Sequence, residues 1–247
     1  MDSTYHRLTR RIGLTYDLTD SLAAYIAYST GFRGAFNFIG MDKPKPETSK
    51  NYEVGLKIDQ KSLGLSGTLA LFQQTRRNVA TADPDQNLAL YGYTVQTGEQ
   101  RARGAEIDMT WEPTATFSVL ANYAYTQSEV TEDNAIPVGS ALPRVPRHSG
   151  RIAVRYRIRD GVAKGLGFGA GVTAVSAREL TLPNTVSVPG YAMIDAQTSY
   201  DFDRYTITLS AINLTGTRAW DSYTYLGLPV VIPVQPRSVY LSLSAHF

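Results

Sequence analysis

Residues able to perform acid–base, nucleophilic or metal chemistry are few in this sequence and widely spaced. Its three histidines are His6, His148 and His246, and none stands at a metal-ligand or catalytic-triad spacing from acidic residues. There is no cysteine, which excludes disulfides, thiolate catalysis and cysteine-ligated zinc. Neither a GxSxG elbow nor a P-loop is present. We therefore expect no enzyme activity, no catalytic residue, no resident metal and no cofactor.

Aromatic residues are concentrated in three segments that lack regular alternation. These are Trp220, Tyr223 and Tyr225 within 217–236, Tyr91 and Tyr93 within 77–94, and Phe36 with Phe38 within 33–48. Two interpretations stay open. The rings contact a ligand, or they belong to the aromatic girdle at a membrane interface. His148 is interpreted as the polar start of a strand, with a ligand contact as the alternative.

Charged residues are scattered, and the formal net charge of +2 gives no indication of a nucleic-acid partner. Two groups of charges fall on one side of an alternating segment. They are Arg151, Arg155 and Arg157 in one segment, and Glu106 and Asp108 in another. Such a face suits bulk water or a hydrated barrel lumen, and we expect these side chains to line a lumen wall.

Alternation of apolar and polar residues with a period of two recurs along the chain and predicts β-strands. In 52–59, for example, Tyr, Val, Leu and Ile alternate with Glu, Gly, Lys and Asp. About eleven such segments occur, each roughly 9 to 13 residues long, the length with which a tilted strand crosses a membrane. The expected spans are 6–18, 21–32, 49–60, 63–75, 95–111, 115–127, 149–159, 165–177, 190–202, 205–216 and 237–247.

The connections alternate between short and long, as in bacterial membrane barrels. Short turns are expected at Thr19-Asp20, 60–62, 112–114, 160–161 and 203–204, and long loops at 33–48, 77–94, 128–148, 178–189 and 217–236. We predict an all-β, antiparallel meander that forms a transmembrane β-barrel. Leu56, Val119, Val154, Leu209 and Leu241 should face outward. A soluble β-sandwich is the alternative, in which these side chains would be buried in a core.

Several motifs, in order, resemble the TonB-dependent siderophore receptor family. They are KPETSKNYEVGLK (45–57), LSGTLALFQQTRRNV (65–79), RARGAEIDMTWEP (101–113), VPRHSGRIAVRY (145–156), VPGYAMIDAQTSYDF (188–202) and TLSAINLTGTRAW (208–220). The terminal Phe247 resembles the assembly signal of outer-membrane proteins. The resemblance extends over nearly the whole chain.

The resemblance implies a plugged barrel of about 22 strands in the outer membrane of a Gram-negative cell. Residues 1–247 would be its C-terminal half, and the strand parity agrees. No signal peptide, TonB box, plug or first half of the barrel is visible in the sequence. We therefore expect a fragment or a truncated gene product that cannot transport by itself.

The resemblance also implies a function, namely energy-coupled uptake of ferric siderophores. Iron would be carried only inside the siderophore, which the loop aromatics Trp220, Tyr223, Tyr225, Tyr91, Tyr93 and Phe36 would contact. The other expected partners are outer-membrane lipid, the barrel-assembly machinery through the last strand, and the TonB-ExbB-ExbD complex through the missing N-terminal region. The lumen-wall charges would pair with one another or with the plug. Alternatives are a passive porin, an outer-membrane hydrolase and a soluble binding module.

Overall fold

Eleven long strands form one antiparallel sheet in the computed structural model, which describes residues 4–34, 44–83, 85–225 and 228–245. The strands are β1 (Arg11–Thr19), β2 (Leu22–Arg33), β3 (Glu47–Gln60), β4 (Leu65–Ala82), β5 (Thr94–Thr114), β6 (Phe117–Glu132), β7 (His148–Arg157), β8 (Leu166–Val175), β11 (Tyr191–Phe202), β12 (Tyr205–Ile212) and β15 (Ser238–Ala245). Each strand pairs with the next along the chain, apart from short insertions after β8 and β12. The predicted all-β meander is confirmed.

The insertions contain short strands of their own. β9 (Arg178–Glu179) pairs with β10 (Ser187–Val188), and β13 (Trp220–Tyr225) pairs with β14 (Leu228–Pro233). The helices of the described ranges are the single turns η1 (Lys61–Leu63) and α1 (Gln86–Leu90). In the part of the chain that the structure describes, no helix has both the length and the apolar character to cross a membrane.

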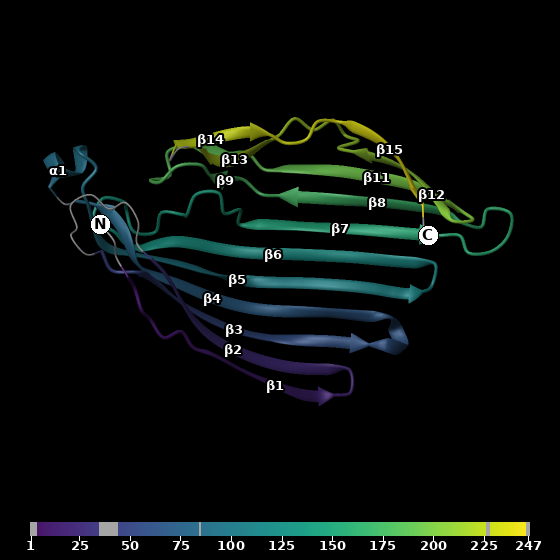
Figure 1. Cartoon of the computed structure of the whole chain (residues 1–247), viewed down its shortest axis with the longest axis horizontal. Helices are drawn as coiled ribbons and strands as arrows, with labels where there is room; N and C mark the ends of the chain where they lie inside the picture. The colour runs from purple at the N-terminus through teal and green to yellow at the C-terminus, as the bar shows by residue number, and fades with distance from the viewer. Residues whose placement is uncertain (1–3, 35–43, 84, 226–227, 246–247) are drawn as a thin grey trace.

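Figure 1 shows a curved sheet that remains open. β1 and β15 form its two edges and do not pair with each other in the described ranges. An open edge leaves a row of backbone N–H and C=O groups without partners, which is not viable in the hydrocarbon of a membrane. Both edges therefore need pairing partners before the sheet can lie in a bilayer.

Several predicted boundaries were wrong at the loop end of the sheet. β4 continues to Ala82 and β6 to Glu132, so the expected loops 77–94 and 128–148 begin too early. Polar side chains hold these extensions: Arg77 Nε lies 2.5 Å from Glu99 Oε2, and Thr131 donates to Glu99 at 3.0 Å. The alternation of apolar and polar residues stops where a strand passes beyond the aliphatic part of the sheet, but the backbone hydrogen bonds between the strands continue. The sequence pattern therefore predicts the end of these strands too early. The first strand, in contrast, is shorter than predicted, because it begins at Arg11 and not at residue 6.

The two faces of the sheet differ in chemistry, because cross-strand partners share a face. One row runs from Ile152 to Val172 and Ile194, and we call this side the apolar face. All five residues predicted to face outward lie on it, in rows that include Leu56↔Leu69, Val119↔Val154 and Leu209↔Leu241. The opposite side, the polar face, carries Glu106, Asp108, Arg151, Arg155 and Arg157.

The apolar face does not pack into a protein core. In the described ranges, four apolar residues are less than 9% exposed, namely Ala70, Val119, Val130 and Val188. Val119 is covered within its own face, where it pairs with Trp111. Most large apolar side chains of this face, such as Leu71 and Ile152, remain exposed. A soluble sandwich would bury this surface, so the structure contradicts that alternative and calls for lipid on the apolar face.

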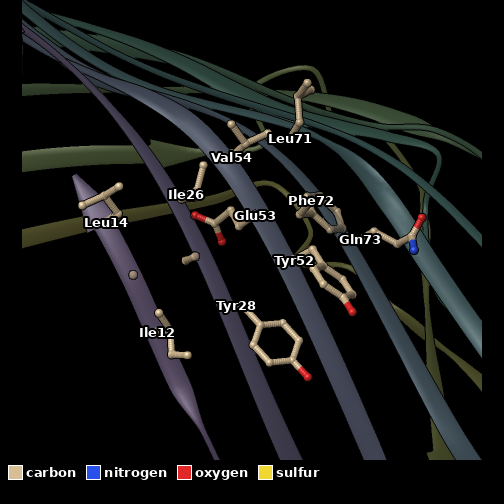
Figure 2. A pocket seen from close by; sticks show the side chains of 12 residues that line it. Ile12, Leu14, Ile26, Tyr28, Tyr52, Glu53, Val54, Leu71, Phe72 and Gln73 are labelled. Atoms are coloured by element: carbon tan, nitrogen blue, oxygen red, sulfur yellow. The ribbon is translucent and has the colours of Figure 1, made fainter. Parts of the chain in front are cut away.

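Aromatic side chains flank the aliphatic band of the apolar face. Figure 2 shows the loop-side flank over β1 to β4, where Tyr28 and Tyr52 border a shallow depression of about 450 Å³ lined by Ile12, Leu14, Ile26, Val54 and Leu71. The Tyr28 and Tyr52 ring centroids lie 5.0 Å apart. Tyr123, Tyr125 and His148 form a second aromatic group on this flank, over β6 and β7, and the Tyr125 and His148 centroids lie 5.2 Å apart. On the turn side, Trp111 and Phe117 meet at 6.1 Å, and Tyr200 and Phe202 at 5.9 Å. An aliphatic band between two aromatic girdles is the arrangement found on the lipid-facing side of membrane β-barrels.

Candidate functional site

The long connections project from one end of the sheet and the short turns from the other. In Figure 1, α1, β9, β13 and β14 lie at the same end, opposite the turn that joins β1 to β2. The predicted common end for these long loops is confirmed. The predicted loop 33–48 is described only at residues 33–34 and 44–48, and β3 already begins at Glu47.

Three of these loops are hydrogen-bonded into one connected body. Asn184 joins the loop before β10 to the loop after β6, since Ala141 N donates to its Oδ1 at 2.7 Å and its Nδ2 donates to Ala141 O at 2.8 Å. Arg144 N donates to Glu179 O at 2.7 Å. Arg178 in turn contacts the β13–β14 hairpin. The three loops therefore form one hydrogen-bonded surface at the loop end of the sheet.

The aromatic residues of this end have different orientations. Side chains alternate along a strand, so Trp220 lies on the opposite side of β13 from Tyr223 and Tyr225. All three are about half exposed or more. Tyr91 follows α1 and is exposed, and Tyr93 is half-buried. No hydrogen bond, ion pair or ring contact joins these two tyrosines to the hairpin within the described ranges, and Phe36 lies outside them.

These loop aromatics are separate from the girdle. The loop-side girdle consists of residues of the main sheet, whereas Trp220, Tyr223 and Tyr225 belong to the separate β13–β14 hairpin and Tyr91 follows α1. They reach neither Tyr28 nor Tyr125 by any ring contact in the described part of the chain. Trp220, Tyr223, Tyr225 and Tyr91 are all exposed to solvent.

Two wall charges of the polar face pair with aspartates of β11 that were not among the predicted site residues. Arg151 Nη1 lies 2.9 Å from Asp195 Oδ2, and Arg157 pairs with Asp201. The expected pairing of these arginines with Glu106 or Asp108 does not occur. Arg155 forms no ion pair with any described residue, and it lines a cavity of about 390 Å³ beside Arg151 and Asp195.

A second charge cluster lies on the polar face next to the loops. Glu47 is buried, and its carboxylate accepts hydrogen bonds from Arg33 at 2.9 Å and from Arg76 at 2.5 Å. Glu47 belongs to the motif at 45–57, from which no individual role was predicted for it. Its signal was the Lys-Pro-Glu start of that motif, whose glutamate opens β3. Within the described residues, no group of three or more His, Cys, Asp or Glu side chains could hold a metal ion.

An open meander with a lipid-compatible apolar face, a charged polar face and long loops at one end defines a segment of a transmembrane β-barrel. The comparison with protein families agrees: residues 1–214 match the TonB dependent receptor-like, beta-barrel family, to which this chain belongs. The chain is accordingly part of an outer-membrane β-barrel of this family of transport receptors.

Named relatives and solved structures give the same class. The metal-pseudopaline receptor CntO of Pseudomonas aeruginosa is 31% identical over 99% of this chain and 34% of its own length. The ferrichrome outer membrane transporter/phage receptor of Escherichia coli is 29% identical over 87% of this chain and 28% of its own. The ferric preacinetobactin receptor BauA of Acinetobacter baumannii superposes with a TM-score of 0.79 at 26% identity, over 95% of this chain and 36% of that one. The chain thus spans about one third of the length of the relatives it matches.

Proposed function

We propose that this chain forms the C-terminal part of an outer-membrane receptor that takes up ferric siderophores by TonB-dependent, energy-coupled transport. The names of the relatives support this, since they include receptors for ferrichrome, ferric pyoverdine and ferrioxamine B. The single observation that carries the proposal is the aromatic, hydrogen-bonded loop body at one end of a lipid-compatible sheet. Such a surface suits a chelate-wrapped metal complex, which presents apolar and aromatic groups.

In this proposal, β1 and β15 pair with further strands to close the barrel. The open edges support it, because neither is viable in lipid. The polar face then lines the lumen, where Arg155 is placed to contact a plug domain. TonB and its partner proteins would act through segments other than the strands described here, and the barrel-assembly machinery would recognise the end of the last strand.

Iron is cargo in this proposal, and the protein needs no resident cofactor. The siderophore fills the coordination sphere of the metal, so the receptor recognises the outside of the complex. Aromatic faces such as Trp220, Tyr223 and Tyr91 would contact apolar parts of the ligand. The arginines of the Glu47 cluster would suit anionic parts.

The proposal is tested with the complete receptor that contains this chain, expressed in cells without other siderophore receptors. Uptake of radiolabelled iron is measured from ferrichrome, ferrioxamine B and ferric pyoverdine, with and without functional TonB. We expect uptake of at least one complex, and none in the cells without TonB. Uptake that does not depend on TonB would indicate a passive channel, and failure to bind or transport all three complexes would contradict the choice of these siderophores as substrates.

A further inference from the structure

The β13–β14 hairpin, which carries Trp220, Tyr223 and Tyr225, is not part of the main sheet. Among the described residues, its two strands pair only with each other. At its base, Val234 N donates to Ala219 O at 3.1 Å. Beyond that base, the ladder of the barrel does not fix its orientation. Contacts outside the ladder join this hairpin to the remaining loops.

One arginine supplies that contact. Arg178 Nη2 donates to Asp221 Oδ1 at 2.6 Å and to Trp220 O at 2.9 Å, and its Nε donates to Ser222 Oγ at 3.4 Å. A single guanidinium therefore binds three consecutive residues at the start of β13. The planar fork of arginine allows this, whereas the point charge of lysine would not reach all three acceptors.

Arg178 is itself held firmly in a neighbouring loop. It pairs with Val188 between β9 and β10, and its guanidinium lies 5.8 Å from the ring centroid of Tyr191, the first residue of β11. The next residue, Glu179, accepts the hydrogen bond from Arg144 through its carbonyl. We call the segment 178–188 the arm. The arm is thus connected both to the sheet and to the loop after β6.

The burial of Arg178 indicates that this contact is more than an incidental surface ion pair. Its side chain is only 3% exposed, whereas that of Asp221 is 53% exposed. The Nη1 atom is buried without a hydrogen-bond partner among the described residues. Removing a guanidinium from water is costly, so the contacts to Trp220, Asp221 and Ser222 must offset that cost.

We infer that Arg178 is a positioning residue, which holds the aromatic hairpin against the arm and so fixes the direction in which its aromatic faces meet a ligand. This inference rests on the proposed function for its effect on ligand binding, and on geometry alone for the position of the hairpin. Arg178 itself need not touch the ligand.

The test measures position and binding separately in the complete receptor. Spin labels on Val186→Cys of the arm and Val231→Cys of β14 report the arm–hairpin distance by pulsed electron paramagnetic resonance. We expect a narrow distance distribution in the parent and a broad one in Arg178→Gln, in Arg178→Lys and in Asp221→Asn. Arg218→Gln, an exposed arginine of the same loop, is the matched control and should leave the distribution narrow.

Binding is measured with ferrichrome, ferrioxamine B and ferric pyoverdine as probes. For whichever probe binds the parent, Arg178→Gln should weaken affinity by about threefold to tenfold, while the unfolding midpoint of the barrel stays unchanged. A distribution that remains narrow in Arg178→Gln would overturn the positioning role. A broadened distribution with unchanged affinity would overturn its link to the ligand. If no probe binds the parent, the proposed siderophores fail, and the distance measurement alone decides whether Arg178 positions the hairpin.

Discussion

Arg151 Nη1 lies 2.9 Å from Asp195 Oδ2, although strand β8 separates the strands that carry them. The guanidinium crosses above Gly171 of β8, where a Cβ atom would stand 2.7 Å from Arg151 Nη2. Arg151 also donates to Thr173 Oγ1 at 2.6 Å. A side chain at Gly171 would oblige the guanidinium to shift, so the glycine leaves room for one arginine to join three neighbouring strands on the polar face.

The first prediction concerns this crossing. In Gly171→Ala the new methyl group should displace the guanidinium and separate it from Asp195. A double-mutant cycle with Arg151→Gln and Asp195→Asn measures the coupling energy, and it removes the general effect of replacing glycine in a strand. We expect a coupling of about 0.2–1 kcal/mol in the parent, because both side chains are partly exposed, and almost none in Gly171→Ala.

Gly13→Ala is the control for the first prediction. A Cβ at Gly13 would meet only Ile26 O at 3.6 Å, an ordinary contact, so the Arg151–Asp195 coupling should persist. If the coupling in Gly171→Ala equals that in Gly13→Ala, the crossing geometry is wrong.

The second prediction concerns Asn213, which is fully buried at the end of β12 with a left-handed backbone (φ 53°). Its side chain donates to Thr217 O at 2.9 Å and to Gln235 O at 3.0 Å, and its Oδ1 accepts from Thr217 N at 2.9 Å. Asn213→Gly keeps the backbone conformation but loses these bonds, so unfolding free energy should fall by about 1–3 kcal/mol. The unfolding free energy of Asn213→Ala should be about 1 kcal/mol below that of Asn213→Gly, because the left-handed conformation is unfavourable for alanine. Denaturant titration of both variants checks the order, and an alanine variant more stable than the glycine variant would refute it.

The third prediction separates ligand-facing from girdle aromatics. Trp220→Ala in the complete receptor should reduce affinity for a bound ferric siderophore by about 2- to 13-fold, the effect of losing about 0.5–1.5 kcal/mol of aromatic contact. Tyr123→Ala, in the girdle, should lower barrel stability and leave affinity unchanged. Equilibrium binding and unfolding are measured on both variants. If Trp220→Ala and Tyr123→Ala change affinity and stability in the same way, the distinction between ligand-facing and girdle aromatics is wrong.

Much of this fold could be predicted from the sequence, because the period-two pattern sets both the strands and their faces. Leu56, Val154 and Leu241 were placed on the correct face from alternation alone. The ends of the strands were harder to predict. Arg77 and Glu99 lie in strands that continue through residues whose polar character predicts a loop.

The loop site was less predictable. Trp220 and Tyr223 are close in the sequence, yet they lie on opposite sides of a hairpin that the pattern did not predict. The role of Arg178 depends on contacts across more than forty residues of chain, for which a single sequence carries no signal.

The fourth prediction concerns orientation. This chain contains no cysteine, so single cysteines can be introduced as reporters. Val138→Cys, in the loop after β6, should react with a membrane-impermeant thiol reagent on intact cells. Val162→Cys, in the turn between β7 and β8, is also exposed but should react only after the outer membrane is opened. Labelling of Val162→Cys and not Val138→Cys on intact cells would reverse the assignment.

The central claim is that one face of this sheet meets lipid and the other meets water. Ile152 on the apolar face and Leu120 on the polar face test it directly, because the two aliphatic residues are 52% and 57% exposed in the sheet. Ile152 also stands midway along its strand between His148 of the loop-side girdle and Tyr156, which pairs with Phe117 of the turn-side girdle. The measurement is the unfolding free energy of the complete receptor in lipid vesicles for Ile152→Arg and Leu120→Arg. We predict a loss of about 2–4 kcal/mol for Ile152→Arg and less than about 1 kcal/mol for Leu120→Arg. Equal losses in the two variants, or a larger loss for Leu120→Arg, would contradict the account.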